Sequence, residues 1–401
     1  MIPILYDKYE TDFLSNGLGQ LADCLTCTVT EEVNGIYECE FTYPMTGAYY
    51  EQLINYGGVV AVEHEHNSDI QLFDIYKYSA PIGGIVTFYA SHVSYRLADY
   101  VRHLDIISVP PAISLPSYPA ELFSVWNDPA TGLFAPLGEF VFTDHTGYPS
   151  GEAWVVSSPY AVRDAMLNTA EENQFPGGSV MQRWKGEWEF DNFHVDYYVK
   201  RGQDRGVQIR YGKNMTNVLR EKDSGSVVSV IVPYWVSSGG TVTNYDPVYS
   251  PYMEHVVSPW QSRGEQMYYG DEMFYLCPAE MKPVPLNISD QFENEPTEAE
   301  AREYCLSYMS KNTTWRASDN ITVDFLDLYG VYRDEGLERL AYCRVGDYVS
   351  ILYPQLGIVS EGVEIMSLTY DVLGDRVTQM QLNSIRTSLA QVIINSLEGT
   401  K

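Results

Sequence analysis

Apolar and polar residues alternate along much of the chain, which is the pattern of half-buried β-strands. From Glu187 to Asp191 acids alternate with aromatic residues, which predicts a strand with one polar and one apolar face. Val195 to Lys200 and Val207 to Tyr211 are predicted to be two further strands, paired as a hairpin across a polar turn. Met215 to Lys222 has helical spacing of its apolar residues. This stretch holds no recognisable catalytic motif.

The first quarter of the chain reads as strands and the part after it as mixed structure. Residues 1 to 92 hold short runs of β-branched and aromatic residues separated by turn signals, which favours a small barrel or sandwich. From Ser91 to Leu104 the apolar residues recur at helical spacing, so we expect a helix there and a new α+β domain. The strands expected in the first domain are Thr26 to Glu32, Ile36 to Tyr43, Val59 to Glu65, Leu72 to Ser79 and Ile85 to Ala90.

The second half of the chain returns to strands after a proline-rich, irregular middle. Val227 to Val236 is an apolar run that suits a strand, and Thr297 with Glu300 forms a capping box that predicts the start of a helix. An amphipathic helix is expected over residues 385–401. A second small β domain is predicted from the runs Ile321 to Leu328, Tyr348 to Leu352, Val363 to Tyr370 and Arg376 to Leu382.

Composition narrows the range of functions. The chain has 401 residues with 45% apolar composition, enough for two or three domains with cores of their own. Its 54 acids against 25 bases give a formal charge of -29, which argues against binding to a nucleic-acid backbone. The 6 cysteines lack the density of a disulfide scaffold and are expected to be reduced thiols. We expect a protein made in a cytoplasm, with no secretory signal and no membrane span.

A family resemblance rests on motifs spread over nearly the whole chain. The central one is GEWEFDNFHV…GQDRGVQIRYGKNMTNV, between Gly186 and Val218. Further matching segments are Leu5-Tyr6, Thr11 to Phe13, Asn16 to Gly19, Cys27 to Gly35, Tyr37 to Glu40, Tyr43-Pro44, Asn320 to Phe325, Val345 to Val349, Leu356 to Ile358 and Tyr370 to Leu373. Together they resemble the phage tail-hub family, which includes siphophage tail-associated proteins often labelled prophage tail endopeptidases and is similar to the baseplate hub protein of contractile-tailed phages.

The resemblance implies a fold and a domain plan. The fold is α+β, mainly β, and baseplate-hub-like, with two small β-barrel domains joined by an α+β domain. The first barrel would span residues 1–92, the α+β domain 93–225 plus 247–317, and the second barrel 226–246 plus 318–384, followed by the carboxy-terminal helix. The chain departs from the family in two places. Gln381-Leu382-Asn383 stands where relatives tend to carry Leu-Gly, and no carboxy-terminal extension follows.

The resemblance also implies a structural function. Three chains would close a ring that adapts a hexameric tail tube to threefold tip components and encloses a channel for DNA or tape-measure protein. The implied partners are two further copies of the chain, a distal tail protein or tail-tube ring, tip or fibre proteins and tape-measure protein, while DNA passes without specific binding. The implied location is the tail tip or baseplate of a virion assembled in the cytoplasm of a bacterial host. No cofactor is implied.

Two other functions are weighed against this structural one. A cell-wall (peptidoglycan) hydrolase would suit the family label, but the sequence contains neither HExxH nor GxSxG. Glu187, Glu189 and Asp191 beside Trp188 resemble a glycosidase pair only superficially, since carboxylates on one strand face do not oppose each other across a cleft. A carbohydrate- or receptor-binding module would suit the 33 tyrosines, which large protein interfaces also enrich. We therefore expect no catalytic residues and no enzyme activity.

Metal binding is also not expected. In His64-Glu65-His66 the two histidines would share a strand face, but no third ligand is evident nearby, and exposure beside the following loop is the preferred interpretation. Cys24 and Cys27 form a lone CxxC without a second pair.

Acidic residues are the candidates for the lining of the channel. A wall of carboxylates repels phosphate and offers a sliding polymer no binding sites. The candidates are the strand faces that bear Glu38 and Glu40 and those that bear Asp324 and Asp327. The alternative for all four is exposure to solvent on the outside of the protein.

Overall fold

The computed structural model of the chain forms two compact units, one of Met1–Leu219 with Ile321–Lys401 and one of Arg220–Asn320. The structure describes residues 1–64, 70–79, 83–102, 113–115, 118–127, 140–149, 154–156, 160–167, 179–223, 230–237, 239–249, 267–269, 272–274, 283–292, 294–312, 318–325, 327–329, 341–353 and 358–382. The predicted helix over 385–401 lies outside these residues.

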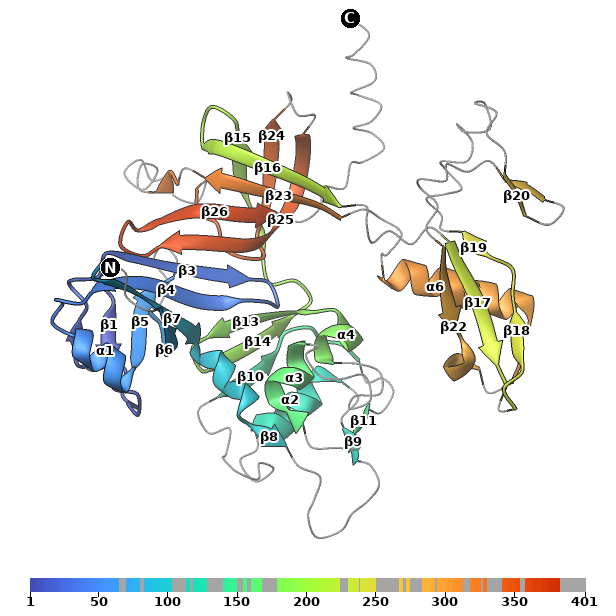
Figure 1. Ribbon diagram of the computed structural model, residues 1–401, viewed down its shortest axis with the longest axis horizontal. Coiled ribbons are helices and arrows are strands. Elements are labelled where there is room, and N and C mark those ends of the chain that lie inside the picture. The colour runs from blue at the N-terminus through green and yellow to red at the C-terminus, as the bar shows by residue number, and fades with distance from the viewer. Residues whose placement is uncertain are drawn as a thin grey trace, which may run out of the picture. The chain divides into compact units, whose positions relative to one another are not determined.

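A 13-stranded sheet forms the framework of the first unit (Figure 1). Its hydrogen-bonded order runs β16-β23-β26-β25-β3-β4-β7-β6-β5-β1-β2, with β24 attached to β25 and β15 attached to β24. The strands are β1 Ile4–Tyr6, β2 Gly19–Gln20, β3 Thr26–Glu32, β4 Tyr37–Pro44, β5 Val59–Glu63, β6 Ile70–Tyr78, β7 Ile85–His92, β15 Asp204–Arg210, β16 Met215–Asp223, β23 Ser318–Phe325, β24 Tyr348–Tyr353, β25 Ile358–Asp371 and β26 Arg376–Leu382.

The alternation read from the sequence explains these strands. In β3 and β4 every second side chain is buried, which places Val29, Cys39 and Phe41 in the core while the residues between them face outward. All five strands predicted in the first 92 residues are present, and the short helix α1 (Tyr50–Tyr56) lies between β4 and β5. The mainly β character of the fold is thereby confirmed.

Strands from the two predicted β domains belong to this one sheet. β25 pairs antiparallel with β3, so residues near the end of the chain continue the sheet that the amino-terminal strands begin. Among the described strands the order does not return to its start. The two closed barrels therefore stay a prediction, as do the domain boundaries.

The strand from Glu187 to Asp191 is confirmed as β13, but its neighbours differ from the prediction. β13 (Glu187–Asp191) turns through Asn192, whose φ of 51° suits a two-residue hairpin loop, into β14 (His194–Tyr198). β15 does not return along β14 and instead pairs parallel with β24. The predicted hairpin of 195–200 with 207–211 is therefore wrong. Side chains at the supposed turn are held in ion pairs that direct the chain toward β24, as described below.

A smaller three-stranded sheet, β10-β14-β13, packs against helices (Figure 1). Its core is aromatic, because Phe123 and Trp126 of a helix meet Phe142, Trp188 and Tyr197 of the sheet. The additional elements are β10 Val141–Asp144, α2 Pro119–Asn127, α3 Val162–Leu167, α4 Val180–Trp184, the pair β8 Val101–Arg102 with β12 Tyr160–Ala161, and the pair β9 Ile113–Leu115 with β11 Trp154–Val156. The mixed α and β character predicted for this part is present.

Two helices predicted from spacing are not α-helices. Residues 215–222 form strand β16, which pairs with β23, so pairing within the sheet overrides a short apolar spacing that fits either structure. The predicted helix from Ser91 to Leu104 is only a 3-10 helix, η1 (Val93–Ala98), followed by β8.

In the second unit, one helix covers a small sheet. β17 (Val230–Val236) pairs with three strands, and α6 (Glu298–Asn312) buries Ala301 and Cys305 against this sheet. The capping box is confirmed, since the Thr297 backbone N–H donates to Glu300 Oε2 over 2.8 Å. The other elements are β18 Val242–Asn244, β19 Val248–Tyr249, β22 Pro283–Asn287, η3 Ser289–Gln291 and the pair β20 Met267–Tyr269 with β21 Glu272–Phe274. The described partners of β17 all lie within this unit, and the predicted grouping of 226–246 with 318–384 stays a prediction.

Candidate functional site

The outward face of the 13-stranded sheet is polar and carries three of the four candidate lining residues. Residues directly opposite each other on paired strands share a face. Glu38 is opposite Thr30, Thr30 is opposite Thr369, and Thr369 is opposite Gln379, which is opposite Asp324. Glu38 and Asp324 thus lie in one row across the sheet, roughly 19 Å apart for four strand spacings.

Hydrogen bonds connect the side chains of this row. The hydroxyls of Thr30 and Thr369 are 3.2 Å apart, and Gln379 Nε2 donates to Asp324 Oδ1 over 3.2 Å. Asp324 Oδ2 accepts from Asn217 Nδ2 of β16 over 3.1 Å. The row therefore continues to the edge strand of the sheet as a half-exposed polar surface.

Glu40 and Asp327, the other two candidates, differ in their exposure and hydrogen bonding. Glu40 is exposed, opposite Tyr89 and on the same side of β4 as Glu38. Both carboxylate oxygens of Asp327 accept backbone N–H groups, from Tyr329 and Val377, each over 2.8 Å. Asp327 therefore holds the start of β26 in place.

A buried charged junction lies between β3, the segment after β14 and the turn before β24. Arg201 is 3% exposed and its Nη2 donates to Glu31 Oε1 over 2.6 Å. The same guanidinium donates to the carbonyl oxygens of Val345 and Trp188, over 3.1 and 3.0 Å. Burial alone would raise the pKa of Glu31, but Arg201 and His64 hold it below its ordinary value. The Glu31 carboxylate stays ionised because the positive Arg201 guanidinium donates a hydrogen bond to it.

A second set of ion pairs adjoins this junction. Lys200 Nζ contacts Glu187 and also Glu364, from which it is 2.8 Å. Burial and the neighbouring Glu364 raise the pKa of Glu187. Burial alone would lower the pKa of Lys200, but its hydrogen bonds to both carboxylates raise it to about 12. These pairs connect β13, β25 and the end of β14.

The three acids of β13 that superficially resemble a glycosidase pair all have structural partners. Glu187 pairs with Lys200, Glu189 accepts from Arg344 Nη2 over 2.8 Å, and Asp191 accepts from Gln71 Nε2 over 2.8 Å. They line up along one strand and are each engaged in joining β13 to its surroundings. We see no opposed pair of carboxylates among them.

Histidines 64 and 92 lie in the core of the first unit. His64 is 4% exposed, so the expected exposure of this residue is wrong, and its Nε2 is 3.4 Å from Glu31 Oε2. His66 lies outside the described residues. His92 stacks on Tyr37 with ring centroids 4.2 Å apart, and burial lowers its pKa well below 6.5. Within the part of the chain that the structure describes, no group of three or more His, Cys, Asp or Glu could hold a metal ion.

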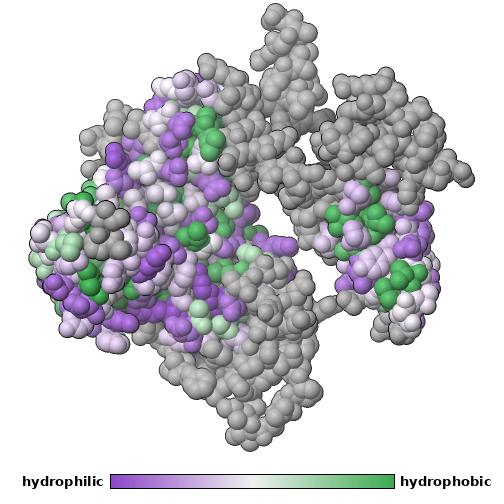
Figure 2. Space-filling view, viewed as in Figure 1, coloured by the Kyte–Doolittle hydropathy of each residue, from purple (hydrophilic) through white to green (hydrophobic). Residues whose placement is uncertain are grey.

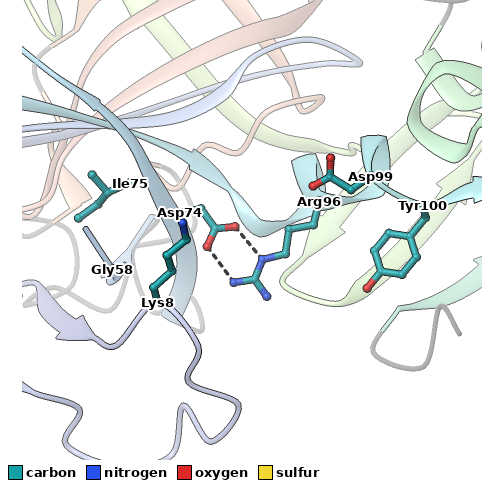
Figure 3. A pocket seen from close by; sticks show the side chains of 7 residues that line it. All are labelled: Lys8, Gly58, Asp74, Ile75, Arg96, Asp99 and Tyr100. Carbon is teal, nitrogen blue, oxygen red and sulfur yellow. Dashed lines mark hydrogen bonds and ion pairs between the residues drawn. The ribbon is translucent and has the colours of Figure 1, made fainter. Parts of the chain in front are cut away.

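An open pocket of about 430 Å³ lies between the loop after β1, β6 and η1 (Figure 3). Arg96 and Asp74 face each other in it with two hydrogen bonds, of 2.7 and 2.8 Å. Its lining residues are Lys8, Gly58, Asp74, Ile75, Arg96, Asp99 and Tyr100. This set contains no histidine, cysteine or serine, so it offers no nucleophile with an adjacent imidazole base.

Comparison with known proteins shows which solved structures the fold is similar to. No protein-family model and no curated protein matches the sequence. Among solved structures, the prophage tail protein gp18 from Listeria monocytogenes matches with a TM-score of 0.52 and 16% identity over 99% of each chain. The 43 kDa tail protein of prophage MuSo2 from Shewanella oneidensis matches with a TM-score of 0.52 and 11% identity over 96% of this chain and 98% of that one. A tail protein from Neisseria meningitidis gives 0.50 and 9% over 96% of each.

The chain has a prophage tail-protein fold. The resemblance inferred from sequence motifs is thereby confirmed at the level of the fold. At these identities the likeness concerns the fold alone, so the function is argued separately below. Of the helices in the described ranges, none has the length and apolar character needed to cross a membrane.

The charged junction is the feature that the sequence analysis missed. The sequence does contain a signal for this junction. Glu31 occupies an inward position of a strand whose other inward positions are Cys27 and Val29. Glu364, between Val363 and Ile365 of β25, is likewise a charge within an apolar run. A charged residue at a core position predicts a buried partner of opposite sign, although it does not identify that partner.

Proposed function

We propose that this protein is a structural hub at the distal end of a phage or phage-derived tail. Three copies form a ring that adapts a hexameric tail tube to threefold tip components and encloses a channel for DNA or tape-measure protein. The observation that carries the proposal is the match to prophage tail proteins over nearly the full length of both chains.

The outward face of the sheet supports the channel part of the proposal. Glu38 and Asp324 lie on it in one row without an intervening lysine or arginine, and Glu40 lies on the same face in the neighbouring row. In a ring of three chains such a face suits a passage, because carboxylates repel phosphate close to the wall and this repulsion is screened beyond about 8 Å at physiological salt. The two barrel domains belong to the same proposal.

The proposed hub has no catalytic function of its own. The partners of the three strand carboxylates support this, since Glu187 and Glu189 are engaged in ion pairs and Asp191 accepts a hydrogen bond from the Gln71 amide. Its partners would be two further copies, the distal tail protein or tube ring, tip or fibre proteins and tape-measure protein. It would be assembled in the host cytoplasm and end up in the virion.

A density map of the assembled tail tip tests the proposal. We expect three copies in a closed ring with the β4 face toward the axis. One, two or six copies, a channel lined mainly by Lys and Arg, or no channel would contradict it. Incubation of the purified chain with peptidoglycan tests the alternative, and release of new reducing or amine ends that is lost in Glu187→Gln would overturn the structural function.

A further inference from the structure

The first unit has two different ends, and each carries exposed apolar side chains. The order of strands ends at β2 on one side and at β16 on the other. The loop from Asp7 to Leu18 joins β1 to β2, and the turn from Tyr211 to Asn214 joins β15 to β16. The two segments therefore adjoin the two opposite edge strands of the sheet, β2 and β16.

The loop before β2 forms an ordered apolar surface, here called the tip. Leu14 is 99% exposed and Tyr9 is 84% exposed. Tyr6 of β1 pairs with Val59 of β5. Tyr9 comes three residues after Tyr6, and Tyr56, which is 68% exposed, comes three residues before Val59. Both Tyr9 and Tyr56 therefore lie at the same end of the antiparallel pair β1–β5. Figure 2 shows small apolar patches among hydrophilic residues at this end of the unit.

The backbone of the tip is fixed by its own hydrogen bonds. The Tyr6 hydroxyl contacts the carbonyl oxygens of Phe13 and Ser15, at 2.9 and 2.6 Å, and the Phe13 ring packs on Tyr6 with centroids 5.2 Å apart. The Leu14 N–H donates to Asp12 Oδ1 over 3.1 Å. Phe13 is thus held inward and Leu14 outward. Exposed apolar side chains on a pre-ordered loop lose little conformational freedom when a partner covers them.

The opposite end carries the complementary charge. The tip holds three carboxylates, Asp7, Glu10 and Asp12, and one ammonium group, Lys8. The stretch from Gly206 to Leu219 contains Arg210 and Lys213 and no acid of its own, and the carboxylate of Asp324 accepts from Asn217 within it over 3.1 Å. Tyr211, which lies between these two cations in the sequence, is 57% exposed and stacks on Tyr353 with centroids 4.7 Å apart. We call Arg210, Tyr211, Lys213 and Tyr353 the basic patch.

We propose that the tip of one copy docks on the basic patch of the next copy. This inference rests on the proposed function, and it assigns the two unlike surfaces that a closed ring requires. Apolar side chains supply the contact area, while the opposite charges set the register and disfavour contact between two tips. A second copy is the occupant because the patch that complements the tip in charge belongs to this same chain and adjoins the opposite edge strand of the sheet.

Two full-length variants test the proposal. Tyr9→Ser/Leu14→Ser removes the apolar contact of the tip, and Arg210→Glu/Lys213→Glu reverses the patch. We expect each to be a folded monomer, with an unchanged circular dichroism spectrum, at concentrations where the natural chain is a trimer by mass photometry. Val141→Ser/Val199→Ser, which replaces side chains 47% and 46% exposed elsewhere, should remain trimeric. Raising the salt concentration should weaken the natural trimer.

Mixing the two variants gives the sharpest result. The patch variant keeps an intact tip and the tip variant keeps an intact patch, so one intact contact can form between them. We expect a one-to-one heterodimer that cannot close a ring.

Trimers formed by either variant alone, or no heterodimer on mixing, would overturn the proposal while leaving a trimeric hub intact. A natural chain that stays monomeric at every concentration tested would overturn both. Variants that form trimers but fail to enter tails would assign the tip to another tail protein and overturn the proposal.

Discussion

Arg201 and Glu31 form an ion pair of 2.6 Å in the protein interior although they are 170 residues apart in the sequence. Their side chains are 3% and 6% exposed. The pair joins the segment after β14 to the central strand β3, while Arg201 also binds the backbone of the turn before β24. One guanidinium thus connects three parts of the chain that the sequence separates widely.

Removing one member of this pair should be costly. Arg201→Met removes the guanidinium that pairs with the buried Glu31, and Glu31→Leu removes the carboxylate that pairs with the buried Arg201. We expect either change to lower the free energy of unfolding by about 3–5 kcal/mol. Urea denaturation followed by tryptophan fluorescence measures this loss. The double variant should recover a good part of it, because no unpaired charge then remains buried.

A surface ion pair provides the matched control for that experiment. Arg376 pairs with Asp371 over 3.3 Å, but its side chain is 60% exposed. Arg376→Met should change the free energy of unfolding by less than about 1 kcal/mol, since water already solvates both charges. Equal losses in Arg201→Met and Arg376→Met would contradict the importance given to burial.

His92 should make the protein sensitive to acid. Burial, helped by His64, Arg163 and Arg96, lowers the pKa of His92 well below 6.5, so the folded chain keeps it neutral. Below pH 6.5 the unfolded chain takes up this proton and the folded chain does not. The free energy of unfolding should therefore fall by about 1.4 kcal/mol for each pH unit below that value.

The variant His92→Gln tests this dependence. Glutamine keeps a polar group near Gln71, which contacts His92 Nε2 at 3.1 Å, and it does not titrate. Thermal unfolding between pH 5 and 7 should show a shallower decline than in the natural protein. The exposed His194→Gln serves as the control for the loss of a histidine. An unchanged slope in His92→Gln would assign the acid sensitivity to other groups.

The capping box should stabilise the second unit. The Thr297 Oγ1 accepts a hydrogen bond from the Glu300 backbone N–H over 3.4 Å. The Glu300 carboxylate in turn accepts a hydrogen bond from the Thr297 backbone N–H. Thr297→Ala should lower the thermal midpoint of this unit by about 5 °C. Calorimetry of the full chain measures the shift. Ser307→Ala, at an exposed position of α6, should leave the midpoint unchanged, and similar shifts in both would argue against a capping effect.

Charge on the outward sheet face should affect DNA passage if it lines the channel. Glu40→Lys places one lysine per chain on that face, and a basic wall binds phosphate by releasing counterions. Particles assembled with this variant should eject DNA more slowly, and added salt should reduce the difference. Glu303→Lys makes the same change of charge at an exposed position of α6. Equal ejection rates in particles with either variant would place Glu40 outside the channel.

The sequence by itself determined the local structure wherever one face of a strand or helix is buried. The alternation in β3, β4 and β7 and the capping box at Thr297 predicted those elements, because burial of every second residue and satisfaction of helix-end N–H groups are local requirements. The motifs around Gly186 to Val218 predicted a tail-protein fold, and the structure confirmed it.

Only the tertiary structure decided which strands pair. The chain between Val207 and Tyr211 could serve as a hairpin partner or as a parallel neighbour of β24, and the ion pairs of Lys200, Arg201 and Arg205 with distant carboxylates select the second. The same holds for Glu38 and Asp324, which share a row only because β25 joins β3. Local pattern specifies which face of a strand is polar, whereas the partners of that strand depend on contacts between residues far apart in the chain.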